Sequence, residues 1–134
     1  MADEAVLVYE LEPPIPFTVT DANGIEKGAI CSLEDPITAS GTTADGSLVA
    51  GIAASEKIAS DGKTKLGIYR KGIFKVTLSG TCTAGDILET DVSPNHVAQY
   101  DAAVSGTRMI GTALESGNSG TILMELNIGP GGNA

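Results

Sequence analysis

The sequence predicts an all-β fold: a small, pseudo-duplicated β-barrel with an extended, proline-containing N-terminal arm. Three observations favour it: short apolar runs rich in β-branched residues, turn signals at short intervals between them, and 17 glycines in 134 residues. Glycine costs a helix about 1 kcal/mol per residue relative to alanine, so a helical bundle is disfavoured. Short strands separated by Gly and Asp turns are typical of barrels and sandwiches.

Residues 1–17 are predicted to form the arm. Residues 4–11 are an apolar, β-branched run without a helix cap, which indicates a strand. The prolines that follow cannot donate ladder hydrogen bonds, so this segment is not a central strand. We expect the arm to reach onto a neighbouring molecule; the alternative is an edge strand on its own barrel. The predicted contact residues are Val6, Val8, Tyr9, Leu11, Pro13, Pro14, Ile15, Pro16 and Phe17.

Residues 18–128 are predicted to form the barrel, and the Gly-rich residues 129–134 a flexible tail. Seven apolar runs predict strands at residues 29–33, 48–53, 64–69, 73–78, 87–90, 109–114 and 121–128. Residues 38–47 are expected to be a flexible polar loop, and residues 53–59 are the one place that favours a helical turn. The predicted core is Ile25, Ile30, Leu33, Ile52, Leu66, Ile68, Phe74, Val76, Ile87, Leu88, Ile110, Leu123 and Leu126.

An internal repeat relates the two halves of the barrel. Residues 25–33 resemble 82–90, residues 49–53 resemble 110–113, and residues 62–69 resemble 120–126. The order is the same and the offset is about 58 residues, too short for either half to bury a core easily. We therefore expect the halves to close on one another. The alternative is chance similarity among Gly-rich strands.

Charge is distributed unevenly along the chain. The formal net charge is −9, yet residues 57–75 hold six of the eight basic residues against one acid. An acidic chain is an improbable partner for nucleic acid. The asymmetry suits a molecule that packs between surfaces of different charge or against copies of itself, although a solvated strand face would look the same. We expect no membrane span and no secretory leader.

Few residues suit catalysis or metal binding. Cys31 and Cys82 align with Ile or Leu of the other half, which predicts buried, reduced thiols, although a disulfide between them stays open. The only histidine, His96, lies in a predicted surface turn; Asp91 or Asp101 and a serine would complete a triad only on paper. No nucleotide-binding or calcium-binding motif is present. We expect a non-enzymatic protein without a cofactor or metal.

The order of these motifs resembles the capsid cement, or decoration, proteins of tailed bacteriophages. The resemblance covers roughly residues 4–128 and is carried by residues 4–9, the proline arm, and residues 25–28, 49–53, 68–76, 83–86 and 110–115. It implies a homotrimeric β-barrel, made in the host cytoplasm, that binds the major capsid protein on the outer surface of an icosahedral head. Its role would be to stabilise the capsid, with no nucleic-acid or membrane partner.

Two other classes of function remain open. One is a small ligand- or carbohydrate-binding β-module of a phage tail or fibre. The absence of Trp and the presence of only three Tyr disfavour it, because sugar sites use exposed aromatic platforms. The other is an accessory domain of an enzyme.

Overall fold

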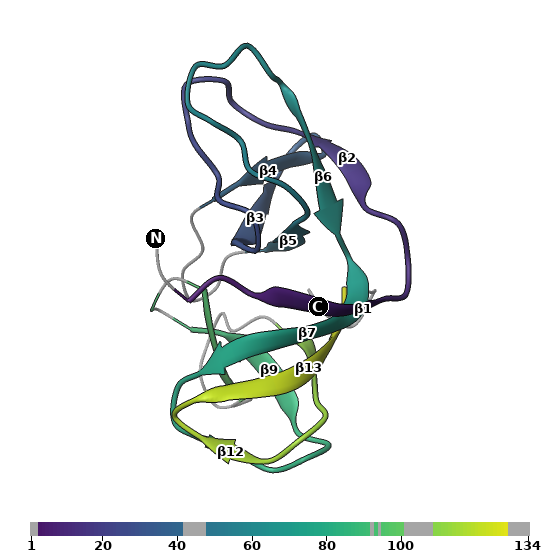
Figure 1. The fold of residues 1–134 in the computed structure, drawn as a ribbon, viewed down its shortest axis with the longest axis vertical. Coiled ribbons are helices and arrows are strands. Elements are labelled where there is room, and N and C mark those ends of the chain that lie inside the picture. The colour runs from purple at the N-terminus through teal and green to yellow at the C-terminus, as the bar shows by residue number, and fades with distance from the viewer. Residues whose placement is uncertain (1–2, 42–47, 92, 94, 101–108, 129–134) are drawn as a thin grey trace.

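The computed structural model describes residues 3–41, 48–91, 93, 95–100 and 109–128, and this part of the chain is all-β (Figure 1). The predicted tail, residues 129–134, lies outside the described residues. The strands are β1 (Val6–Glu10), β2 (Ile15–Thr18), β3 (Ile30–Glu34), β4 (Thr38–Ser40), β5 (Val49–Ala53), β6 (Lys65–Tyr69), β7 (Lys71–Leu78), β8 (Thr81–Cys82), β9 (Ile87–Thr90), β10 (His96–Gln99), β11 (Met109–Ala113), β12 (Gly117–Asn118) and β13 (Thr121–Asn127).

The strands close two barrels, which lie one above the other in Figure 1. The first has the order β2-β4-β3-β5-β6 and the second the order β7-β10-β9-β11-β13, closed by pairing of β13 with β7. Each contains one parallel pair, β2 with β4 and β7 with β10, and antiparallel pairs elsewhere. The two halves therefore share one topology, strand for strand, and the all-β, duplicated barrel is confirmed.

The halves differ from the expectation in how they close. Each half closes a barrel of its own, where the sequence suggested that the halves close on one another. The barrels nevertheless share buried surface. Ile30, Val49 and Ile52 of the first half belong to the apolar cluster of the second barrel. Both faces of β5 are covered, so all five of its residues are buried. Each short half therefore gains buried surface by packing against the other.

Most of the predicted core residues are buried, including Phe74 and Ile110. Three are not. Ile87 is 47% exposed because strand side chains alternate and its neighbour Leu88 takes the inward position. Leu123 is half-buried on the outer face of β13, between the inward Ile122 and Met124. Leu33 is half-buried and packs against the first core.

Two barrel strands lie where the sequence predicted loops. Thr38–Ser40 of the predicted polar loop forms β4, and His96–Gln99 forms β10. Both are short and carry few large apolar residues, so periodicity does not identify them. Residues 42–47 of the predicted loop lie outside the described residues. Residues 53–59 contain no helical turn; β5 ends at Ala53, and Lys57 instead forms a β-bridge with Ile25.

One glycine occupies the same place in each half, where the backbone of a neighbouring barrel strand leaves no room for a Cβ. A Cβ at Gly51 would overlap the backbone oxygen of Tyr69 on β6, and a Cβ at Gly111 would overlap that of Glu125 on β13. The register of the neighbouring pair is irregular at both places. The sequence match between these glycines therefore reflects a shared requirement for backbone contact.

Candidate interaction surface at the N-terminal strand

The N-terminal strand β1 lies on the chain's own second barrel, as the edge strand of its sheet. It pairs antiparallel with β7, so the chain adopts the alternative arrangement in which the arm folds back. All five residues of β1 are nevertheless exposed, with Val6 at 60% and Tyr9 at 65%. A soluble protein rarely leaves such an apolar strand uncovered, so this surface is a candidate for contact with another molecule.

The register of β1 divides its side chains between two surfaces. Val6 is opposite Lys75 and Tyr9 is opposite Ile73, on the outer face of β7. Leu7 is opposite the inward-facing Phe74. An irregularity between Leu7 and Tyr9 inserts one extra residue, and this bulge turns the strand. Val6 and Tyr9 therefore add to the outer surface of the second barrel.

The predicted contact residues separate into two groups. Val6, Val8, Tyr9, Leu11 and Pro13 are exposed, and Pro14 is half-buried beside Gly67. The other group, Ile15, Pro16 and Phe17, lies in β2 and belongs to the first barrel.

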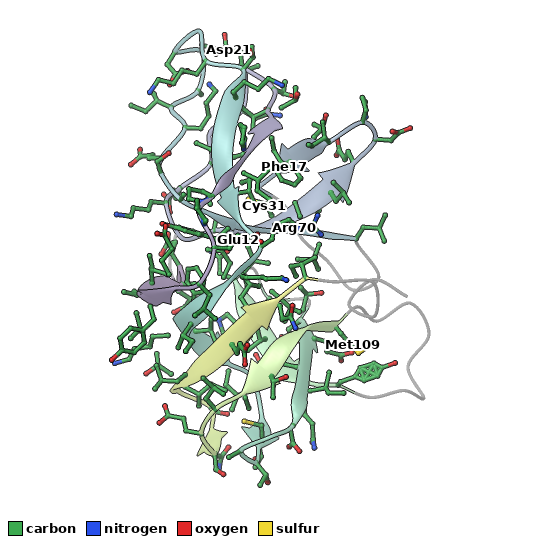
Figure 2. All side chains as sticks on the ribbon, turned by 90° about the vertical axis from the view of Figure 1, so that its right-hand side faces the viewer. Glu12, Phe17, Asp21, Cys31, Arg70 and Met109 are labelled. Carbon is green, nitrogen blue, oxygen red and sulfur yellow. The ribbon has the colours of Figure 1, made fainter. Side chains whose placement is uncertain are left out.

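Phe17 is therefore not a contact residue of a projecting arm. It is 2% exposed in the first core, with the Arg70 guanidinium carbon 6.0 Å from its ring centre (Figure 2). Pro16 is tolerated in β2 because β4 joins that strand only at Thr18, which leaves no ladder partner to lose on that side. The barrel thus begins at Ile15, three residues before the predicted boundary.

A groove separates β1 from the first barrel. Its volume is about 510 Å³, and its lining includes Leu7, Lys27, Ala54, Tyr69 and Phe74. The rings of Tyr69 and Phe74 meet edge to face with centres 5.6 Å apart. Burial and a hydrogen bond to the Glu10 carboxylate raise the pKa of the Tyr69 hydroxyl, so this phenol stays protonated and donates to the strand.

The start of the arm is fastened by His96. The Nε2 atom of His96 lies 2.8 Å from the Asp3 carboxylate, and its Nδ1 lies 2.8 Å from the Ser79 hydroxyl. Asp91, one of the two acids that would complete a triad on paper, instead donates its backbone N–H to the His96 carbonyl oxygen, and Asp101 lies outside the described residues. His96 is not in a turn; it begins β10.

Ser79, His96 and Asp3 have the composition of a catalytic triad. Their surroundings instead indicate a structural contact that holds the arm to the second barrel. The Ser79 backbone N–H already donates to Val97, so it is not available to a developing oxyanion. Next to His96, Asn95 accepts a hydrogen bond from the Ile30 N–H at 3.0 Å. Residues 95 and 96 thus tie the second barrel to both the first barrel and the arm.

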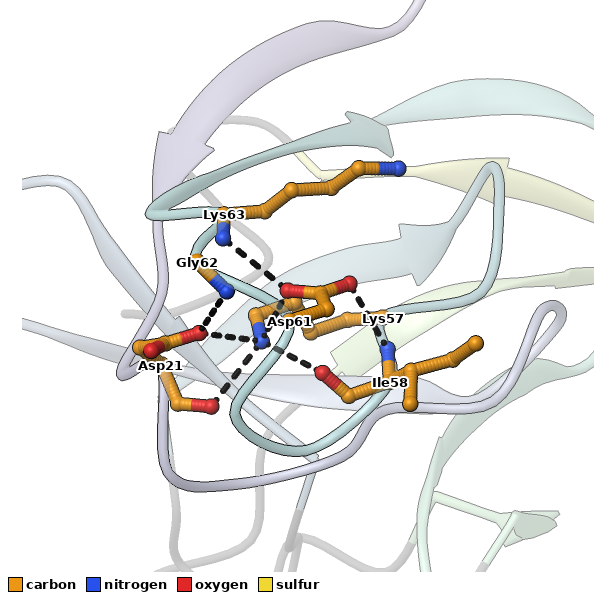
Figure 3. Close-up of polar contacts among 6 residues, drawn as sticks. All are labelled: Asp21, Lys57, Ile58, Asp61, Gly62 and Lys63. Atoms are coloured by element: carbon orange, nitrogen blue, oxygen red, sulfur yellow. Dashed lines mark hydrogen bonds and ion pairs between the residues drawn. The ribbon is translucent and has the colours of Figure 1, made fainter.

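A buried lysine organises the far end of the first barrel (Figure 3). Lys57 is 1% exposed, and its ammonium donates to the Asp21 and Asp61 carboxylates at 3.0 and 2.7 Å. It also donates to the backbone oxygens of Asp21 and Ile58. We call Lys57, Asp21 and Asp61 the lysine cage. The cage joins the turn at residue 21 to the loop at residues 57–62.

The cage shifts the protonation equilibria of its members. Burial alone would lower the pKa of Lys57, but hydrogen bonds to Asp61 and Asp21 outweigh burial and raise it. The hydrogen bond from Lys57 lowers the pKa of Asp61 from 3.8 to about 2. Both groups are therefore charged at neutral pH, and every ammonium proton has a partner. Sequence patterns did not indicate this cage, because Asp21 and Lys57 are far apart in the chain.

The cysteines are buried and free, as predicted. They lie in different apolar clusters, Cys31 in the first and Cys82 in the second. Burial raises the pKa of the Cys31 thiol to about 12 and also raises that of Cys82. Neither thiol is therefore suited to act as a nucleophile at neutral pH.

The described ranges contain no group of three or more His, Cys, Asp or Glu side chains placed to hold a metal ion. No helix in them has the length and apolar character needed to cross a membrane.

Comparison with known proteins identifies no family for this chain. No protein-family model matches it, and no curated protein matches it significantly.

Proposed function

We propose that this chain is a non-enzymatic capsid cement protein that binds the outer surface of an icosahedral phage head and stabilises it. Its partners would be the major capsid protein and copies of itself in a homotrimer, and its location the outside of the virion. The observation that carries the proposal is the exposed apolar strand β1 on an otherwise closed pair of barrels.

The geometry of β1 suits binding to another protein. Its outer edge has no strand partner among the described residues, and an extended segment can pair with such an edge. Val6, Val8, Tyr9 and Leu11 supply apolar contact area beside that edge, each more than 40% exposed. Closed barrels held together by shared burial supply a rigid body behind the strand. Repetition on a symmetric shell would multiply such contacts by avidity.

The test is binding to expanded phage heads that lack the protein, measured by cosedimentation. We expect Val6→Ser, Val8→Ser and Tyr9→Ser, combined in one chain, to weaken binding by about tenfold or more, since truncating a central aromatic contact costs about 2 kcal/mol or more. Ile58→Ser with Ile87→Ser is the matched control, because both residues are exposed apolar side chains remote from β1 in sequence. Wild-type protein that stays in the supernatant contradicts the proposal.

The groove beside β1 supports a second candidate, a small ligand- or carbohydrate-binding module of a phage tail or fibre. Tyr69 and the charged Lys27 both line this groove. Binding sites for small ligands commonly combine aromatic side chains with a few polar or charged groups. Binding on a glycan panel, lost in Tyr69→Ala and kept in Val8→Ser with Tyr9→Ser, neither of which lines the groove, would favour this candidate over a cement protein.

A further inference from the structure

The outer face of the second barrel has an uncommon composition next to β1. In β7 the residues Gly72, Phe74, Val76 and Leu78 are buried, so the intervening Lys71, Ile73 and Lys75 point outward. The cross-strand register then sets their neighbours. We call these outward-facing residues of β7 and their cross-strand neighbours the β7 outer face. Its members are Val6, Tyr9, Lys71, Ile73, Lys75, Leu123, Glu125 and Asn127.

Two neighbouring rows of this face combine apolar side chains with one charged side chain each. Lys75 lies between Val6 of β1 and Leu123 of β13. Ile73 lies between Tyr9 and Glu125 in the next row. Val6, Tyr9, Ile73 and Leu123 thus form one apolar surface across three strands.

The lysines of this face have no partner among the described residues. Neither Lys71 nor Lys75 makes a hydrogen bond or ion pair in the part of the chain that the structure describes, and both are exposed. Glu125 is the one carboxylate in these rows. The face is therefore apolar in its middle and basic along β7, which favours a partner that is apolar and acidic.

The same chain carries a segment of this complementary kind. Leu11, directly after β1, is 56% exposed and lies between Glu10 and Glu12. Glu10 is held by Tyr69, whereas Glu12 has no partner among the described residues. Outside residues 57–75 the chain has sixteen acids and two bases. A second copy therefore carries a strong net negative charge over most of its sequence.

We propose that the β7 outer face binds a second copy of this chain, which contributes the acidic segment Glu10–Glu12. Leu11 packs against Ile73 and its neighbours, and Glu12 pairs with Lys71 or Lys75. The proposal rests on the homotrimer of the proposed function and names the surfaces that form it. In that trimer Val6, Tyr9 and Leu11 face a second copy, and the free edge of β1 with Val8 faces the shell. Donor segment and acceptor face are different surfaces, so the same contact repeated head-to-tail around a threefold axis would close the homotrimer.

The test is the mass of the full chain in solution without any shell, measured by sedimentation equilibrium at low and high salt. We expect a trimer that weakens as salt is raised, because exposed ion pairs are screened. Lys71→Glu with Lys75→Glu should raise the dissociation constant by about tenfold or more, since like charges then face each other. Lys63→Glu with Lys65→Glu makes the same change of charge on the other barrel and should keep the trimer.

A charge exchange identifies the partner segment. Adding Glu12→Lys to the Lys71→Glu and Lys75→Glu chain should restore part of the association. Adding Glu56→Lys, which changes an exposed acid elsewhere, should restore none. The charge-reversed variant, Lys71→Glu with Lys75→Glu, is called the reversed chain. If its circular dichroism shows that it does not fold, Lys71→Gln with Lys75→Gln replaces it and should give an intermediate dissociation constant.

Three results would overturn the proposal. Wild-type protein that is monomeric at every concentration shows that a second copy is not the occupant. A reversed chain with wild-type mass shows that the β7 outer face does not form the contact, and if that chain loses only head binding, the face belongs to the shell. Equal rescue by Glu12→Lys and Glu56→Lys assigns the effect to net charge. Head binding of the wild-type protein is measured separately, so failure of the subunit contact and failure of the cement function give different results.

Discussion

The two barrels share a topology but have different interiors. The second barrel is filled with large side chains such as Phe74, Leu88 and Met124, and its cluster is extended by Ala5 of the arm and by residues of the first barrel. Alanine recurs in the first barrel, whose core includes Ala29, Ala39, Ala50 and Ala53.

The first barrel is completed in other ways. Its outward-facing Ile30, Val49 and Ile52 pack against the second barrel, and its far end is held by the lysine cage. Strand order and close backbone approach are therefore common to both barrels, while the side chains that fill their interiors differ. The second barrel is stabilised by large apolar side chains in its core. The first barrel is stabilised by packing against the second and by the ion pairs of the lysine cage.

The largest expected effect is at Phe74, the aromatic side chain of the second core. Phe74→Ala should cost about 3–5 kcal/mol, as is usual for a buried aromatic. Phe17→Ala should fall in the same range, and because the barrels share buried residues, both should shift a single urea transition. Two separate transitions would show that the barrels unfold independently. An unchanged midpoint for Phe74→Ala would contradict its place in the core.

The paired glycines test whether the halves depend on the same backbone contact. Gly51→Ala and Gly111→Ala should each cost about 1–3 kcal/mol, because a Cβ at either place overlaps a backbone oxygen of the adjacent strand. Gly62→Ala is a comparison in which no atom lies near the added Cβ, although its positive φ adds strain. Thermal unfolding measures all three. A cost at only one of Gly51 and Gly111 would show that the contact is not equivalent in the two halves.

Removing the lysine cage should affect the first barrel alone. Lys57→Met leaves two carboxylates without their cation and should lower the melting temperature. Lys63→Met, at an exposed lysine in the same loop, should leave it nearly unchanged. Hydrogen exchange should show faster opening near residues 21 and 57–62 and unchanged protection in β13. Uniform loss of protection would indicate that the cage supports the whole molecule.

Acid should weaken the same cage in a defined range. The pKa of Asp61 is lower in the folded chain, about 2, than its ordinary value of 3.8. Its contribution to stability is therefore present above about pH 4 and is lost as the pH falls toward 2. Melting temperatures of wild type and Asp61→Asn should converge across this range. Parallel curves down to pH 2 would contradict the role of Asp61.

The smallest effects should come from the cysteines and the histidine. Cys31 and Cys82 are buried with raised pKa values, so the native protein should resist thiol reagents at pH 8 that label both residues in urea. Cys31→Ala, Cys82→Val and His96→Ala should leave head binding intact. Loss of binding by a folded variant would assign that residue to the contact surface.

The sequence predicted the strands that carry long apolar runs and the duplication, because turn glycines and β-branched runs are local signals. It did not predict β4 and β10, whose pairing depends on partners elsewhere in the barrel. Phe17 was assigned to the arm because the prolines dominate that stretch, yet register alone places it inside the first barrel. The lysine cage joins residues distant in sequence, and such contacts leave no periodic pattern. Val6 and Tyr9 were predicted to contact another molecule; their arrangement beside Lys75 and Ile73 needed the strand register.

The near-continuous path from β6 to β7 has a mechanical consequence. Only Arg70 separates the two strands, so one extended stretch of backbone takes part in both barrels. A tensile force along this stretch would load the hydrogen bonds of both barrels in shear, and many would have to break together. A force applied across β1 would instead peel its few bonds from β7 one after another. We therefore expect the molecule to resist stretching along this axis and to detach its N-terminal strand under a much smaller load.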